Sequence, residues 1–122
     1  PAASAVYDGA APTLLFTGTI RPNVRAHQLL LPAEADPLDV LLRHLAAAQL
    51  RSLLVEGGAE LLGHFLRSDR WDEARVIHGA THFGNGTAAP IVPTPAQRTL
   101  TSGPDTLTFH TRRTAVHPTW LW

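Results

Sequence analysis

The run Leu53-Leu54-Val55-Glu56-Gly57-Gly58 has the residue types of a phosphate-binding turn. An apolar stretch ends in a carboxylate, and two glycines follow before a helical pattern begins. Glycines let the backbone turn sharply and let a phosphate group approach without meeting a Cβ atom. The first amides of the next helix have no partner within it, so they are available to a pyrophosphate and the helix dipole helps them. The sequence therefore predicts a nucleotide-diphosphate site at this turn.

Two simpler explanations stay open for the same residues. A Gly-Gly turn between a strand and a helix is often only a means of tight packing, and this one lacks the GxGxxG pattern of dinucleotide-binding folds. The Glu56 carboxylate could interact with nearby amides or with a surface arginine and touch no ligand at all.

The composition argues against several other kinds of site. The chain has no cysteine, which excludes disulfides, thiol nucleophiles and thiolate metal sites. Its ten basic and ten acidic side chains balance, so nothing draws it to nucleic acid or to an anionic membrane. No apolar run approaches the roughly 20 residues of a membrane span, and residues 1–11 do not resemble a signal peptide. We therefore expect a cytoplasmic protein.

Charged and histidine residues outside the turn are assigned structural roles. His78 and His82 are four residues apart on a strand-to-loop segment, where this interval does not bring both rings to one face, so we expect no metal site. Arg112-Arg113 is expected to be a solvated or edge-protecting pair at a strand end. Asp69, Asp72 and Glu73 gather at a helix-to-strand turn, where capping is the expected role.

The elements that position the turn follow from periodicity and from breakers. Asp36-Pro37 predicts a helix start, because it joins an N-cap acid to a proline at the first helical position. Gly103-Pro104-Asp105 predicts a hairpin turn. The expected elements are strands at 13–17 and 27–31 with a turn at 21–23, a helix from 37 to about 49, a strand at 52–55, a helix after Gly58, and strands at 74–78, 98–102 and 106–112.

The order of these elements predicts an α/β fold built as one domain over residues 1–122. Alternating strands and helices imply central parallel strands with flanking helices, and the last hairpin adds antiparallel edge strands. Residues 1–12 are expected to be a loose lead-in. Residues 115–122 are expected to be a tail whose apolar Trp120-Leu121-Trp122 could dock on the sheet or on a partner.

Several segments together resemble the C-terminal reductase domain of the bifunctional riboflavin-biosynthesis deaminase/reductases, relatives of dihydrofolate reductase. The Ser52–Gly58 run is similar to the nucleotide-binding turn of that family. The other similar segments, in chain order, are Thr13-Leu14-Leu15-Phe16-Thr17, Trp71-Asp72-Glu73-Ala74-Arg75-Val76-Ile77, Phe83-Gly84-Asn85-Gly86 with Ala89-Pro90, and Thr106-Leu107-Thr108-Phe109-His110-Thr111. The resemblance spans roughly residues 13 to 113, and it implies a dihydrofolate-reductase-like mixed sheet.

The resemblance implies an activity and its site. Family members use NADPH to reduce 5-amino-6-(5-phosphoribosylamino)uracil to the ribitylamino product, and the enzyme contributes mainly alignment. By position, Glu56 would face the substrate and Thr17 would touch the nucleotide, although a strand-end threonine can equally be satisfied within its own turn. The residues expected along the cofactor phosphates are Gly57, Gly58, Ala59, Glu60, Leu61, Leu62, Gly63 and His64.

The resemblance also implies what the chain lacks. Nothing here corresponds to the first strands of the family's reductase domain, or to its zinc deaminase domain. We therefore expect the chain alone to be inactive, with the N-terminal half of the domain as its partner and a homodimer as its assembly. Two alternatives stay open: a dihydrofolate-reductase-like enzyme for another heterocycle, and a catalytically silent dimerisation domain of this fold.

Overall fold

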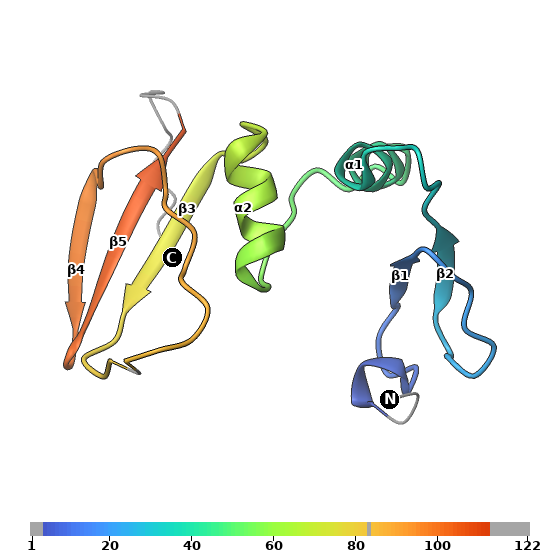
Figure 1. The fold of residues 1–122 in the computed structure, drawn as a ribbon, viewed down its shortest axis with the longest axis horizontal. Coiled ribbons are helices and arrows are strands. Elements are labelled where there is room, and N and C mark those ends of the chain that lie inside the picture. Colours follow the sequence, from blue (N-terminus) through green and yellow to red (C-terminus); the bar gives the residue numbers. More distant parts are fainter. Residues whose placement is uncertain (1–3, 83, 113–122) are drawn as a thin grey trace. The chain divides into compact units, whose positions relative to one another are not determined.

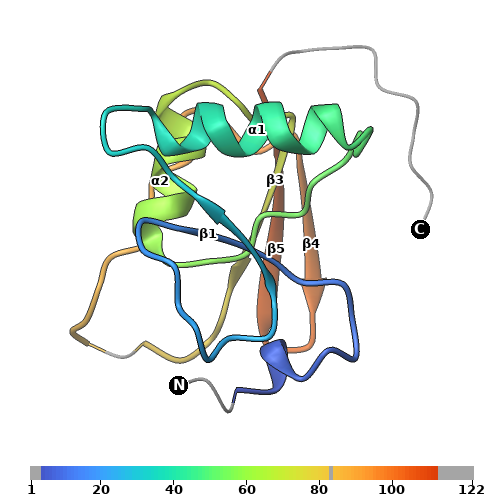
Figure 2. The ribbon, with the colours of Figure 1, turned by 90° about the vertical axis from the view of Figure 1, so that its right-hand side faces the viewer.

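The computed structural model describes residues 4–82 and 84–112, and the chain divides into two compact units. The first unit is residues 1–53 and the second is residues 54–122. Figures 1 and 2 show the two units from two sides, coloured along the sequence. Each unit is built from strands and helices, so the predicted mixed α/β class is confirmed.

The first unit contains a parallel strand pair (Figure 1). β1 (Leu14–Thr17) pairs with β2 (His27–Leu30), with Leu14 opposite His27 and Thr17 opposite Leu30. The Gln28 side chain braces the loop between them, because its Oε1 accepts from the Arg21 amide and its Nε2 donates to the Arg21 carbonyl, both at 2.8 Å. Residues 1–12 were expected to be a loose lead-in, but a short 3₁₀ helix, η1 (Ala5–Tyr7), forms within them.

The helix of the first unit, α1 (Pro37–Ala47), begins where the sequence predicts. The Asp36 side chain accepts a hydrogen bond from the Leu38 amide at 2.9 Å, which caps one of the unpaired donors of the first turn. Leu38 itself is buried at 3% exposure. The helix packs on β1, where the rings of His44 and Phe16 meet edge to face with centroids 5.8 Å apart.

The second unit contains one helix and an antiparallel sheet. α2 (Ala59–Arg67) is followed by β3 (Glu73–His78), β4 (Arg98–Ser102) and β5 (Asp105–Thr111). The strand order is β3-β5-β4, and Figure 1 shows β5 between its two neighbours. The last hairpin was expected to supply edge strands, but of its two strands β4 lies at an edge and β5 does not; the other edge strand is β3. The seven-residue β5 pairs along both sides and holds this sheet together.

The strand predicted at residues 52–55 is absent, and that prediction was wrong. Residues 50–58 have no regular structure, and Leu53 and Leu54 are 48% and 83% exposed. A strand exists only through the backbone hydrogen bonds of a neighbouring strand, and no strand in residues 4–82 or 84–112 pairs with this segment. The apolar pattern identified a segment suited to a sheet interior, but it carried no information on the partner.

None of the helices in the described part of the chain has the length and apolar character needed to cross a membrane.

Candidate functional site

The predicted phosphate-binding turn forms an exposed bend that leads into α2. Glu56, Gly57 and Gly58 are all exposed. Gly58 is the N-cap residue, with extended backbone angles (φ −66°, ψ 165°) and no side-chain cap on the helix. The first hydrogen bond across the new helix runs from the Leu62 amide to the Gly58 carbonyl at 3.2 Å. The amides that precede it, those of Ala59, Glu60 and Leu61, have no helical acceptor and can face a bound anion.

The two glycines of the bend have different roles. A Cβ atom added at Gly58 would meet nothing within 4 Å, so this position lies open to a ligand. A Cβ added at Gly57 would lie 3.2 Å from Leu61 Cδ2, closer than most such contacts. The packing explanation therefore accounts for Gly57, whereas the space at Gly58 is open and would admit a phosphate group.

The last three residues expected along the cofactor lie deeper in the helix. The Leu62 amide is already bonded, Gly63 is buried, and the His64 carbonyl accepts from Ser68 Oγ at 2.7 Å. A Cβ at Gly63 would lie 2.7 Å from a guanidinium nitrogen of Arg67, whereas its contact with Pro90 Cβ at 3.9 Å would be an ordinary one. These three residues can line the site, but only the main-chain amides of the first turn of α2 are available to donate to a phosphate.

Thr17 belongs to the first unit, and its hydroxyl has hydrogen-bond partners within its own turn. It is 8% exposed at the end of β1. Its hydroxyl donates to the Thr19 carbonyl at 2.9 Å and accepts from the Thr19 amide at 3.3 Å. This geometry is the satisfied strand-end hydroxyl left open as an alternative. Its contact with a nucleotide stays a prediction.

The charged side chains near the bend are acidic, so an anion bound there would have to be held by the backbone. Glu56 and Glu60 carry negative charge, and the basic residues of α2, His64 and Arg67, lie in its last turn. A carboxylate in the first turn suits the positive end of the helix dipole. It adds no attraction for a phosphate, so the exposed amides and the dipole have to supply that attraction.

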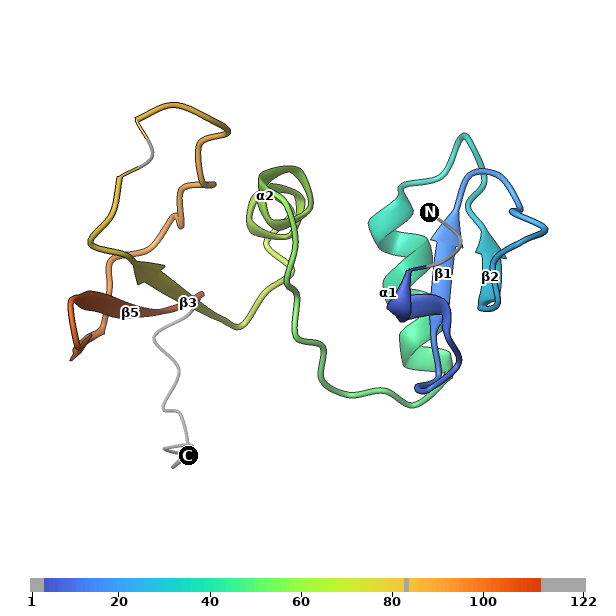
Figure 3. The ribbon, with the colours of Figure 1, turned by 90° about the horizontal axis from the view of Figure 1, so that it is seen from below.

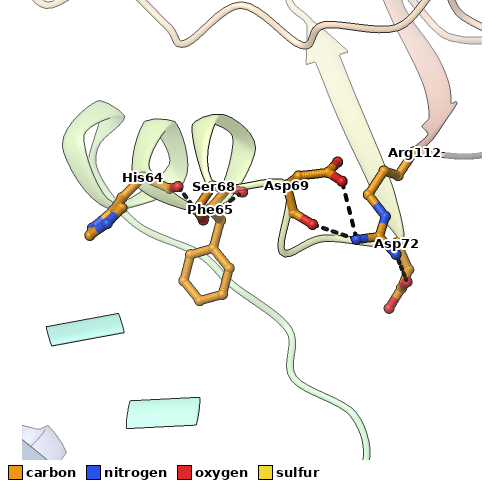
Figure 4. A network of polar contacts seen from close by, with 6 residues as sticks. All are labelled: His64, Phe65, Ser68, Asp69, Asp72 and Arg112. Atoms are coloured by element: carbon orange, nitrogen blue, oxygen red, sulfur yellow. Dashed lines mark hydrogen bonds and ion pairs between the residues drawn. The ribbon is translucent and has the colours of Figure 1, made fainter. Parts of the chain in front are cut away.

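The C-terminal end of α2 is anchored to the sheet by Arg112 (Figure 4). The Arg112 amide donates to the Asp72 carbonyl at 3.1 Å, and its guanidinium donates to the Asp69 carbonyl. The guanidinium also lies 3.6 Å from the Asp69 carboxylate and 3.9 Å from that of Asp72. Ser68 Oγ closes the last turn by donating to the His64 carbonyl. Arg112 thus joins the end of β5 to the turn after α2.

This arrangement corrects one expectation from the sequence. Arg112 was expected to be solvated or to protect a sheet edge, but its side chain is only 25% exposed and pairs with Asp69 and Asp72. Its partners lie about 40 residues earlier in the chain, and no local pattern reveals a pairing at that separation. Arg113, the other member of the predicted pair, lies outside the described residues.

A second polar network missed from the sequence ties the loop before β4 to the sheet. His110 Nδ1 lies 2.8 Å from the Thr94 carbonyl, so this nitrogen carries the proton and donates. His110 Nε2 lies 3.0 Å from Thr108 Oγ1, which in turn lies 3.4 Å from His78 Nε2. His78 therefore faces a hydroxyl, and no group of three potential metal ligands occurs among residues 4–82 and 84–112.

Comparison with known proteins assigns the family. The model of the RibD C-terminal domain matches residues 1–114, which is nearly the whole chain. No curated protein and no solved structure matches the chain. The matched range includes the bend at Glu56-Gly57-Gly58, all of α1 and α2, and every strand.

Proposed function

The chain belongs to the RibD C-terminal domain family, the reductase domain of riboflavin biosynthesis, and on that premise we propose its specific reaction. The family makes the chain an oxidoreductase domain in general terms. We propose the NADPH-dependent reduction of 5-amino-6-(5-phosphoribosylamino)uracil to the ribitylamino product. The observation that carries the cofactor assignment is the open approach at Gly58, where a Cβ would meet nothing within 4 Å.

The residues at the bend suit a dinucleotide diphosphate. The amides of Ala59, Glu60 and Leu61 would donate to its oxygens, and the dipole of α2 would favour its charge. NADPH, when bound, supplies a hydride from its nicotinamide ring. The proposed reduction would place that hydride on the sugar carbon attached to the amine, with cleavage of the bond from this carbon to the ring oxygen and protonation of the oxygen. Glu56, at the end of the apolar segment, would face the substrate.

The proposed partner is the N-terminal half of the domain, as part of the same polypeptide or as another one. The exposed leucines at positions 53 and 54 support this, because an apolar segment suited to a sheet interior stands without a strand beside it in the described residues. We propose that added strands cover the segment and complete the substrate site, and that the complete protein forms a homodimer. The chain of residues 1–122 alone would then bind cofactor weakly and turn over no substrate.

Two measurements test the proposed function. NADPH and NADH are titrated against the protein while nicotinamide fluorescence is followed, and oxidation of the reduced cofactor is then followed after the pyrimidine is added. Saturable NADPH binding with turnover, seen only when the N-terminal half is supplied, is the expected result. Binding without turnover of this pyrimidine would favour another heterocycle, and absence of binding in the complemented protein would favour a silent domain. Robust turnover by residues 1–122 alone would contradict the proposed need for a partner.

A further inference from the structure

The loop between β3 and β4 carries an asparagine between two glycines, and Figure 3 shows this loop, in yellow to orange, extending away from β3 and β5. Gly84, Asn85 and Gly86 are all exposed, and the glycines have φ angles of +81° and +132°. A Cβ added at either glycine would meet nothing within 4 Å. The Asn85 side chain and the Gly86 amide have no hydrogen-bond partner among residues 4–82 and 84–112. Within the described part of the chain, Asn85 thus lies in open solvent next to an unbonded main-chain nitrogen.

This combination makes an asparagine chemically unstable. The side-chain amide carbon is an electrophile, and the main-chain nitrogen of the next residue attacks it when the backbone between them is free to rotate. Glycine at the next position hinders this attack least, because no Cβ stands beside the nitrogen. A hydrogen bond donated by that nitrogen has the opposite effect, since it must break before the attack.

We propose that Asn85 is a site of spontaneous deamidation. Solvent hydroxide removes the proton of the Gly86 amide, and the nitrogen then forms a bond to Asn85 Cγ. The bond from Cγ to the side-chain nitrogen breaks, and ammonia leaves with a proton from water. Water next opens the five-membered succinimide ring. Cleavage of the ring bond at Cγ leaves an aspartate, and cleavage at the main-chain carbonyl carbon leaves an isoaspartate, with the chain now running through Cγ.

Both products change the charge of the protein, and one of them changes its backbone. The new carboxylate gives eleven acidic side chains against ten basic ones, so the formal net charge falls from 0 to −1. Isoaspartate also adds a methylene group to the main chain of the loop. The loop approaches α2 at Pro90, whose Cβ would lie 3.9 Å from a Cβ added at Gly63. The modified protein is therefore more acidic, with an altered loop next to that helix.

Asn23, the other asparagine of the chain, is an internal control. It is also exposed, in the loop between β1 and β2. The next residue is Val24, whose branched side chain crowds the attacking nitrogen. The Val24 amide donates to the Arg21 carbonyl at 3.3 Å. Breaking that hydrogen bond should by itself slow the reaction at Asn23 about fivefold, and the side chain should slow it further.

Mass spectrometry of the aged protein tests the proposal. Purified protein is incubated at neutral pH and digested with trypsin, which separates the two asparagines because cleavage after Arg75 and Arg98 releases residues 76–98. We expect this peptide to gain the mass that replaces an amide NH₂ by OH, with fragmentation placing the gain on Asn85. A methyltransferase specific for isoaspartate should label the product. Asn23 should convert at least about fivefold more slowly.

A free peptide of residues 76–98 measures what the fold does to the reaction. If the loop is as open as its contacts indicate, the folded protein should convert at a rate within about threefold of the peptide. Asn85→Gln should abolish the mass gain, since glutamine would have to close a larger ring, and Asn23→Gln should leave it unchanged. An Asn85 that stays intact in the protein while the peptide converts would overturn the proposal. Equal conversion at Asn23 and Asn85 would also overturn it, because the free amide and the glycine would then have no effect.

Discussion

Replacing Gly58 by alanine tests the central idea of the site, because the change should leave the fold intact. The added Cβ meets nothing within 4 Å, and the backbone angles at Gly58 suit any residue. Alanine is a poorer N-cap than glycine by about 0.5–1 kcal/mol. It also restricts the unfolded chain, which stabilises the protein by about 0.4–1 kcal/mol. These two effects nearly cancel, so the free energy of unfolding should hardly change.

Cofactor binding should respond differently. In the proposed site, a phosphate oxygen would reach the amides of α2 through the open space at Gly58, and a methyl group there would keep it at a distance. Loss of one hydrogen bond to a charged group costs about 1.5–3 kcal/mol. The dissociation constant for NADPH should therefore rise roughly 10- to 150-fold. The loss should be similar for NADH, because both cofactors share the diphosphate.

The assay is a fluorescence titration of NADPH, paired with urea unfolding of the same samples. Gly79→Ala is the matched control, since its Cβ would make only an ordinary contact of 3.8 Å with Asp105 Oδ1. Gly57→Ala should show the reverse pattern, with stability lowered more than affinity, because its Cβ would lie 3.2 Å from Leu61 Cδ2. A folded Gly58→Ala protein that binds NADPH as tightly as the unaltered one would refute phosphate binding by the bend.

Substitutions at three further positions test contacts within one unit or the other, each by urea unfolding followed by circular dichroism. Arg112→Gln should lower the free energy of unfolding by about 1–2 kcal/mol, because the partly buried guanidinium leaves the Asp69 carbonyl without its donor; an unchanged midpoint would show that the anchor contributes nothing. Asp36→Ala should cost about 1 kcal/mol through loss of the cap on the Leu38 amide, and Asp36→Asn should restore most of it. Gly103→Ala should cost about 1 kcal/mol or more because φ is +58° there, whereas Gly103→Asn should be better tolerated.

The features predicted correctly from the sequence are those that short-range chemistry fixes. Asp36 followed by Pro37 determined the start of α1, since a cap and a preset φ act within one turn. Gly103 determined the hairpin between β4 and β5 in the same way. The exposed amides after Gly58 are also local, because every helix leaves its first donors unpaired. The bend could therefore be located without knowledge of the rest of the fold.

Apart from the short helix η1 in the lead-in, the failures concern partners distant in sequence. The pattern of Ser52–Val55 suits a buried strand, but whether a strand forms depends on a neighbour that the pattern does not name. Arg112 looked like a surface residue because Asp69 and Asp72 lie far back in the chain. β5 looked like an edge strand because pairing along both sides is a property of the sheet and not of the strand.

Both local interactions and contacts distant in sequence act on α2. The distant contacts hold its C-terminal end, and local geometry determines its N-terminal end, where the proposed site lies. The C-terminal end of the helix is fixed by Arg112 and by the buried Phe65 and Trp71. The segment that leads into its N-terminal end is exposed and has no strand partner among the described residues. When a binding-competent state is only partly populated, the apparent affinity falls by that fraction. Covering residues 52–55 should therefore tighten cofactor binding without adding any contact to the cofactor, since it would hold the bend in the conformation that the amides of α2 require.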